Sequence, residues 1–294
     1  MSGRCYAASM DLEGVHRRSV ASMQIGVSSM EQLKERMRST WMAGDFGKIA
    51  EYSAKPAEAF VEVLNIRPGM QVLDVACGTG NLAIPAARKG ARVSGVDIAT
   101  NLLAQARARA KGEGLEIAFE EGDAEQLPFP DEQFDLVMSM FGAMFAPDPE
   151  RVASELARVS RHGGRIAMAN WTPEGFTGKM FRLSSRHVPP PVELPAPTLW
   201  GDEAVARLRL RDHGVEIQTT RRSILFDYPF SPREVVQFFR EYFGPTKVAF
   251  SRLDAAAQDE YRDDLEKLWS EHNQASDGNT LIQNEYLEVI GTRL

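Results

Sequence analysis

A carboxylate and a pair of glycines lie close together in the stretch VLDVACGTGNLA, residues 72–83. Its second half, from Gly78 through Gly80 to Ala83, satisfies the G-x-G-x-x-G/A pattern of a turn that leads from a strand into a ligand-binding helix. Such a turn often holds the pyrophosphate of a dinucleotide. Here Asp74 precedes the glycines, and no lysine or arginine of the stretch offsets its negative charge. A cationic ligand suits this turn better than a pyrophosphate.

Further acids follow the next two apolar segments, at Asp97 and Asp123. S-adenosylmethionine (SAM) has matching needs, because its ammonium and sulfonium are cations and its ribose and adenine carry donors. We expect Asp74 to attract the ammonium, Asp97 to accept both ribose hydroxyls and Asp123 to accept from the adenine amino group. Charge-assisted hydrogen bonds of this kind contribute roughly 1.5–3 kcal/mol each. The pattern of acids therefore predicts a SAM site.

Short apolar runs alternate with helical patterns between residues 70 and 171, as required to position these acids. The runs predict five buried strands, namely MQVLDVA, ARVSGVDI, LEIAFEEGD, FDLVMSM and GGRIAMANW. The alternation predicts a parallel, doubly wound sheet with right-handed crossovers. Ligands of such sheets bind beyond the carboxyl ends of the strands, beside the first strand, which is where Asp74 and Asp97 stand.

The flanking segments predict helices and two more strands. Apolar residues at helical spacing favour helices over 30–41 and 56–64, and a capping box opens a helix at Ser231. VEIQTTRRSILF and YLEVIGTRL are typical of strands. We therefore expect a disordered leader over 1–29, N-terminal lid helices over 30–69, a SAM-binding core over 70–171, and a substrate cap with the remaining strands over 172–294.

Four motifs in order resemble those of class I SAM-dependent methyltransferases: VLDVACGTGNLA, VSGVDIATNLL, EEGDAEQLPFPDEQFDLVMS and RVSRHGGRIAMANW. The broad small-molecule group that includes the ubiquinone/menaquinone-biosynthesis C-methyltransferases is the most similar. The resemblance implies an α/β fold with a doubly wound, mostly parallel, seven-stranded Rossmann-like sheet and helical lid insertions. It also implies a set of cofactor-binding residues, which are Asp74, Gly78, Thr79, Gly80, Asp97, Ile98, Leu102, Asp123, Ala124 and Met140.

Each part of the cofactor has its own residues in this scheme. The glycine turn and Asp74 would line the methionine portion, and Asp97 would hold the ribose. Ile98 and Leu102 would lie near the adenine ring, with Asp123 and Ala124 at its edge. Met140 stands after the fourth strand, where the quinone enzymes often have a serine, so the resemblance does not extend to their substrate.

The resemblance implies methyl transfer to a small-molecule acceptor by positioning and desolvation. No metal-ligand pattern is present, and the general base stays unknown, although His187 lies in the proline-rich segment that could overhang the methyl group. The alternative is a non-catalytic SAM-binding protein that regulates or binds a partner. A nicotinamide oxidoreductase would need a pyrophosphate site without Asp74.

Composition limits the partners. With 41 acidic against 34 basic side chains the chain carries a net charge of −7, which argues against nucleic acid. No run is long and apolar enough to predict membrane insertion. Its two cysteines form no C-x-x-C pair, which is typical of a cytoplasmic protein. The sequence gives no indication of the oligomeric state.

Several candidate residues also have simpler interpretations. Asp74 and Asp123 could each stabilise their own turn. Asp97 could cap the helix that begins near Thr100, but Thr100 itself is expected to cap it. Glu125 is expected to be solvated. The loop after the fourth strand is apolar, and we expect the helix ending at Trp41, the segment 171–200 and the helices around 238–250 to close over an acceptor there.

Overall fold

The computed structural model describes residues 27–190 and 194–294. Contacts divide the chain into two compact units, Met1–Met37 and Arg38–Leu294. The leader expected over 1–29 lies outside the described residues, except for its last three, which begin helix α2 (Val27–Met42). The second unit contains the sheet and all the helices that follow α2.

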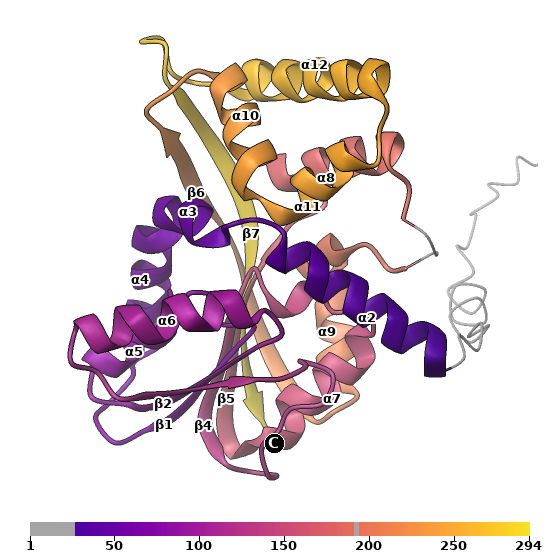
Figure 1. The fold of residues 1–294 in the computed structure, drawn as a ribbon. Coiled ribbons are helices and arrows are strands. Elements are labelled where there is room, and N and C mark those ends of the chain that lie inside the picture. The colour runs from indigo at the N-terminus through magenta and orange to yellow at the C-terminus, as the bar shows by residue number, and fades with distance from the viewer. Residues whose placement is uncertain (1–26, 191–193) are drawn as a thin grey trace, which may run out of the picture. The chain divides into compact units, whose positions relative to one another are not determined.

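The described residues form one seven-stranded sheet in the order β3-β2-β1-β4-β5-β7-β6 (Figure 1). Its strands are β1 (Gln71–Val75), β2 (Arg92–Asp97), β3 (Ile117–Glu121), β4 (Phe134–Met140), β5 (Ser160–Trp171), β6 (Val215–Tyr228) and β7 (Thr280–Arg293). Strands β1 to β5 are parallel to one another, and β7 is antiparallel to both β5 and β6. This confirms the doubly wound, mostly parallel sheet. The strand order reverses between β1 and β4, which is the topological switch point of such a sheet.

Helices connect the strands as the sequence predicts. Around the parallel strands lie α4 (Ala54–Val63), α5 (Ala83–Arg88), α6 (Thr100–Gly112), α7 (Pro149–Val159) and α9 (Glu203–Arg211). The chain also contains α3 (Phe46–Ala50) and three 3₁₀ turns, η1 (Glu51–Ser53), η2 (Ala143–Phe145) and η3 (Pro197–Gly201). Sequence periodicity does not predict these four elements, because each is too short for a helical repeat to show.

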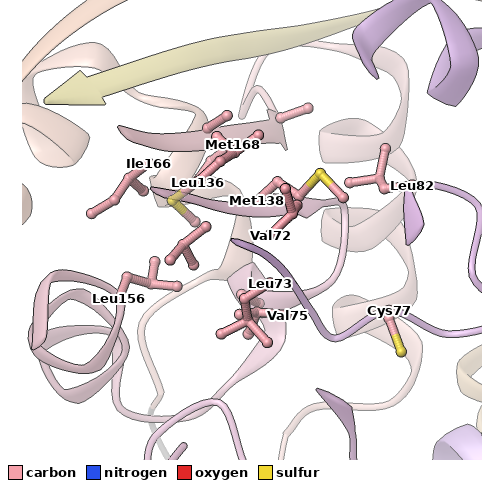
Figure 2. Packing of buried hydrophobic residues seen from close by; sticks show 14 of the residues in the cluster. Val72, Leu73, Val75, Cys77, Leu82, Leu136, Met138, Leu156, Ile166 and Met168 are labelled. Atoms are coloured by element: carbon pink, nitrogen blue, oxygen red, sulfur yellow. The ribbon is translucent and has the colours of Figure 1, made fainter. Parts of the chain in front are cut away.

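The core of the sheet explains why β1 is an uninterrupted apolar run. Val72, Leu73 and Val75 are fully buried, since helices cover both faces of this strand. They belong to one cluster with residues of β4, β5 and α7 (Figure 2). Leu156 of α7, Ile166 and Met168 lie in the same cluster. This packing fixes the carboxyl ends of β1 and β4 next to each other.

A second apolar cluster forms a cap, defined here as α8 (Phe176–His187), α10 (Pro232–Tyr242), α11 (Gly244–Ser251) and α12 (Ala255–His272) with the adjoining ends of β6 and β7. Figure 1 shows β6 and β7 running beyond the other strands to reach these helices. Trp269 packs against Phe176 at 4.5 Å between ring centroids and against Tyr228 at 5.9 Å. The predicted capping box at Ser231 and Glu234 is present at the start of α10. Long paired strands thus carry the cap beyond the sheet.

Gly80 tests how tightly the turn after β1 is packed. Its φ is +82°, and an added Cβ would lie 3.3 Å from Phe119 and 3.4 Å from Ile84. We expect Gly80→Ala to lower the free energy of unfolding of the ligand-free protein by about 1–3 kcal/mol, from strain and overpacking together. Urea denaturation measures this loss. Gly112→Ala is the control, since nothing lies within 4 Å of that Cβ and it should be almost neutral; equal effects at both positions would contradict the packing account.

Candidate cofactor site

The glycine turn is held at both ends by two buried carboxylates. Asp74, in β1, is 2% exposed, and Asp97, the last residue of β2, is 7% exposed. Asp74 accepts a hydrogen bond from Ala83 N at 3.0 Å. Asp97 accepts from Gly78 N and from Ala99 N, each at 2.8 Å. The structure therefore brings the two acids to the same turn, and each also stabilises the backbone around it.

The turn itself has an unusual backbone. Ala76, Gly78 and Gly80 all have positive φ, at 55°, 52° and 82°. Cys77 N donates to Val96 O of β2 at 3.0 Å, which ties the turn to the neighbouring strand. A Cβ on Gly78 would meet nothing within 4 Å, whereas one on Gly80 would press on the core. Gly78 therefore leaves open space for a ligand, and Gly80 serves the packing below it.

Burial makes the negative charges of this site costly. It raises the pKa of Asp74 well above the usual carboxyl range, and the charge of Asp97 raises the Asp74 pKa further. Burial likewise raises the pKa of Asp97. For both acids, the described groups that favour the ionised form are backbone N–H donors, and no cation is among them. A bound cation would supply the missing charge, and a pyrophosphate would add to the repulsion.

Residues from the following strands extend the site along the sheet edge. Ile98 is half-buried directly after Asp97, and Leu102 is buried in the first turn of α6. Gly122 N donates to Asp97 O at 3.1 Å, which holds the loop after β3 beside the end of β2. Asp123 and Ala124 are half-buried in that loop. The predicted ribose and adenine residues thus lie on neighbouring segments.

Asp123 also stabilises its own turn, in agreement with its simpler interpretation. Its Oδ1 accepts from Glu125 N at 2.9 Å, and Asp123 forms a β-bridge with Gln126. This contact uses one carboxylate oxygen. It is compatible with a second role, because a carboxylate has several acceptor positions.

Two predictions about neighbouring residues are wrong. Thr100 does not cap α6: the N-cap is Ala99, without a side-chain cap, and the Asp97 carboxylate binds the Ala99 N–H instead. Glu125 is not solvated but 3% exposed. Its Oε1 accepts from Asp148 N at 2.7 Å, just before α7, where a negative charge is favoured by the helix dipole. The Glu125 contact cannot be predicted from the sequence, because it depends on how the loop before α7 folds back. The Asp97 contact is local, since it joins residues two apart in the chain.

Ser139 is a positioning residue that the sequence patterns do not predict. Its hydroxyl donates to Val75 O at 2.7 Å and accepts from Ala143 N at 3.0 Å. It thereby ties the end of β1 to the loop after β4. A Cβ on Gly142 of that loop would lie 2.7 Å from the Cβ of Ala76, so the loop and the glycine turn approach closely. The one signal in the sequence is a lone serine inside the apolar run FDLVMSM.

The loop after β4 carries Met140, which is half-buried, and Phe141, which has a φ of 56°. The Phe141 ring stacks on Trp171 at the end of β5, with 3.5 Å between ring centroids and 4° between ring planes. This places an aromatic surface at the carboxyl ends of β4 and β5. It lies beside the turn that Asp74 and Asp97 hold.

Comparison with known proteins agrees with this geometry. Residues 73–168 match the family model described as "Methyltransferase domain". The chain belongs to the class I SAM-dependent methyltransferases. An uncharacterized protein of Mycobacterium tuberculosis is 43% identical over 218 residues, which cover 74% of this chain and 80% of that protein. The methyltransferase GfsG of Streptomyces halstedii is 40% identical over 130 residues, which cover 43% of this chain and 47% of GfsG.

The solved structures bear out the fold of this methyltransferase. The YcgJ protein of Bacillus subtilis superposes with a TM-score of 0.56 at 18% identity, covering 81% of this chain and 97% of YcgJ. This likeness confirms the predicted Rossmann-like fold. The match to the methyltransferase family model confirms the predicted family and SAM as its cofactor. The enzyme's described residues contain no group of three or more His, Cys, Asp or Glu side chains that could hold a metal ion. Within the same residues, no helix is long and apolar enough to cross a membrane.

The raised pKa of Asp74 predicts a stability gain from neutralising it in the apo methyltransferase. For an acid with a raised folded-state pKa, the penalty is absent below the unfolded pKa of about 3.9 and grows as the pH rises through the folded pKa. We expect Asp74→Asn to be about 1–2 kcal/mol more stable than wild type at pH 8 and equal to it near pH 4. Urea denaturation without ligand at the two pH values measures this difference.

Asp135 provides the matched control, because its carboxylate also accepts a β1 backbone N–H, from Gln71, but is paired with Arg161. Asp135→Asn should lose stability at pH 8. A loss of stability in Asp74→Asn at pH 8 would contradict the account of an uncompensated charge.

Proposed function

We propose that this methyltransferase transfers the methyl group of SAM to a small, partly apolar acceptor held between the loop after β4 and the cap. The supporting observation is a group of aromatic rings from four segments that meet near that loop. Trp41 at the end of α2 lies 5.0 Å from Phe145 of η2, measured between ring centroids. Phe145 lies 5.7 Å from Phe181 of α8, and Trp41 lies 5.9 Å from Phe243 between α10 and α11.

These four rings come from the three segments that the sequence predicts to close over the acceptor and from the loop that they would cover. Trp41, Phe145 and Phe181 are half-buried, so part of each ring is accessible. Partly accessible aromatic rings are typical of the lining of pockets for ligands with a ring or an alkyl chain. The sheet alone would hold the cofactor without any of these segments.

The residues proposed for the cofactor are those that the sequence named. Asp97 is proposed for the two ribose hydroxyls, and Asp74 for the cationic methionine portion. The support is their burial without a cation and the open space beside Gly78. The remaining positions of the proposed set are Thr79, Gly80, Ile98, Leu102, Asp123, Ala124 and Met140.

Methyl transfer from SAM requires mainly that the protein position the reactants and exclude water. SAM supplies an electrophilic methyl group on its sulfonium. Holding a nucleophile near that methyl group, in line and about 3–3.5 Å away, supplies roughly 7–11 kcal/mol of the barrier. An aromatic wall also keeps water from the reacting atoms. His187, one candidate base noted in the sequence, pairs with Asp264 of α12 at 2.9 Å and lies beside Tyr261, so the cap offers it a structural role.

The ribose assignment of Asp97 is tested by the cofactor product, S-adenosylhomocysteine. We expect Asp97→Ala to weaken its binding by about 30-fold or more, which corresponds to roughly 2–4 kcal/mol for two lost hydrogen bonds. Isothermal titration calorimetry measures the change. NAD serves as the control ligand and should not bind measurably to wild type. Unchanged affinity for S-adenosylhomocysteine in Asp97→Ala would contradict the assignment of Asp97 to the ribose.

The acceptor is found by mass spectrometry of metabolite extracts incubated with the enzyme and SAM, in which products gain one methyl mass. Transfer should continue in EDTA. With the acceptor in hand, hydrogen exchange should show added protection of residues 176–187 and 235–250 when acceptor and S-adenosylhomocysteine are both bound. These segments should gain protection because lids that close over a substrate loosen without it.

Helix α7 is the internal control of this experiment, since it packs under the sheet core and should be unaffected. Full protection of the cap segments in the apo protein, with no change on binding, would show that they are a fixed cover rather than a lid.

A further inference from the structure

A groove of about 700 Å³ lies between helix α4 with η1 on one side and strands β6 and β7 on the other. This volume is within the range of small-molecule sites. Its lining differs from that of the cofactor site and includes none of the residues proposed for SAM. Phe60 of α4, Ile224 of β6 and Tyr286 of β7 are buried along it. Val63 and Leu225, at 50% and 52% exposure, are large apolar side chains that line it and face solvent.

Polar groups in the groove are concentrated on one face of the β6–β7 pair. Arg222 and Tyr286 are register partners on these antiparallel strands, so their Cβ atoms are about 5 Å apart. Glu288, two residues further along β7, is on the same face and is 5% exposed. Arg222 donates to its two carboxylate oxygens from Nε at 2.7 Å and Nη2 at 2.9 Å. The negative charge of Glu288 is thereby offset.

Two hydrogen-bond donors in the groove remain available after Arg222 pairs with Glu288. Within the described part of the chain, nothing accepts a hydrogen bond from Arg222 Nη1 or from the Tyr286 hydroxyl. The Arg222 side chain is 43% exposed, so its guanidinium is accessible. Lys55 adds a second cation to the lining and has no ion-pair partner among the described residues. Three acids also line the groove: Glu288 is held by Arg222, and Glu51 pairs with Lys48. Asp227 lies five residues from Arg222 along β6, which is roughly 17 Å of extended strand.

We propose that this groove binds an organic carboxylate with an apolar body, separately from SAM. The carboxylate meets Arg222 Nη1 and the Tyr286 hydroxyl, and the apolar part covers Phe60, Ile224 and the exposed side chains at the rim. Charge complementarity at Arg222 selects an anion, because the two uncommitted polar groups there, Arg222 Nη1 and the Tyr286 hydroxyl, are donors and Lys55 adds a positive charge to the lining. The inference does not depend on which molecule is methylated.

The site also lies next to the loop after β4. The Tyr286 ring meets Phe141 edge-on, at 5.6 Å between ring centroids, and Phe141 stacks on Trp171. Tyr286 therefore connects the groove to Phe141, which directly follows Met140. The groove ligand is a neighbour of the acceptor region without entering the cofactor turn.

The test uses laurate, a twelve-carbon carboxylate, below its micelle concentration, with the full-length protein saturated with S-adenosylhomocysteine. Calorimetry should show laurate binding at least tenfold more tightly than dodecylamine, the cation of equal chain length. Tyr286→Phe should weaken laurate binding about threefold to tenfold, because it removes one donor and keeps the ring. Arg222→Gln should weaken it at least tenfold.

Two further variants make the test independent of folding defects. Arg221→Gln is the matched control, since Arg221 is the neighbour of Arg222, pairs with Glu285 and does not line the groove. It should bind laurate like wild type. Ala59→Trp fills the groove from an exposed position of α4 and should abolish laurate binding while S-adenosylhomocysteine still binds.

The proposal is overturned if laurate does not bind, if dodecylamine binds equally well, or if Ala59→Trp and Arg222→Gln bind laurate like wild type. Displacement of laurate by S-adenosylhomocysteine would also overturn it, because the two would then share one site. None of these results depends on finding a methyl acceptor, so they leave the proposed function to its own tests.

Discussion

Two buried carboxylates at the ends of neighbouring strands are the constraint on which this enzyme's site depends. Asp74 and Asp97 are removed from water, and backbone N–H groups alone favour their ionised forms within the described structure. Burying charge in this way costs free energy unless a partner compensates it. A cationic cofactor with ribose hydroxyls provides that compensation. The two buried charges therefore destabilise the apo protein locally, and ligand binding removes this destabilisation.

The surrounding architecture keeps these charges in place. Parallel pairing of β1 with β2 and β4 brings three strand ends to one edge of the sheet. The Asp97 carboxylate fixes the glycine turn through Gly78 N, and Ser139 fixes the loop after β4 through Val75 and Ala143. The same edge thus holds a polar turn for the cofactor and an apolar wall for an acceptor. The extended β6–β7 pair then carries the cap that contributes aromatic rings to this wall.

Much of this was predictable because its causes are local. Uninterrupted apolar runs such as MQVLDVA predict buried parallel strands, and the capping box at Ser231 marks the start of α10 from four residues alone. Asp74 and Asp97 were identifiable because acids inside apolar runs are rarely buried without a partner or a ligand. The site roles themselves stay predictions. The burial of Glu125 was not predictable, since it depends on a loop returning to the start of α7. The Thr100 cap was wrongly predicted because α6 has Ala99 as its N-cap and the nearby Asp97 binds the Ala99 N–H.

The residues that would select the acceptor and those that form the groove also could not be predicted from the sequence. Trp41, Phe145, Phe181 and Phe243 are far apart in the chain, and only the fold brings their rings together. The same holds for Arg222 and Tyr286, which are 64 residues apart and face each other through strand register. The alignment with GfsG covers less than half of this chain, so it does not identify an acceptor. Acceptor specificity therefore depends on tertiary contacts of the cap.

The most direct test of the central claim is a crystal structure of the protein with S-adenosylhomocysteine. The account predicts both ribose hydroxyls within about 3 Å of the Asp97 carboxylate oxygens and the methionine ammonium beside the turn that follows Asp74. It also predicts that the loop after β4 faces the sulfur atom. A nucleoside bound away from Asp97, or a site in which a lysine or arginine neutralises both acids in place of the ligand, would contradict it.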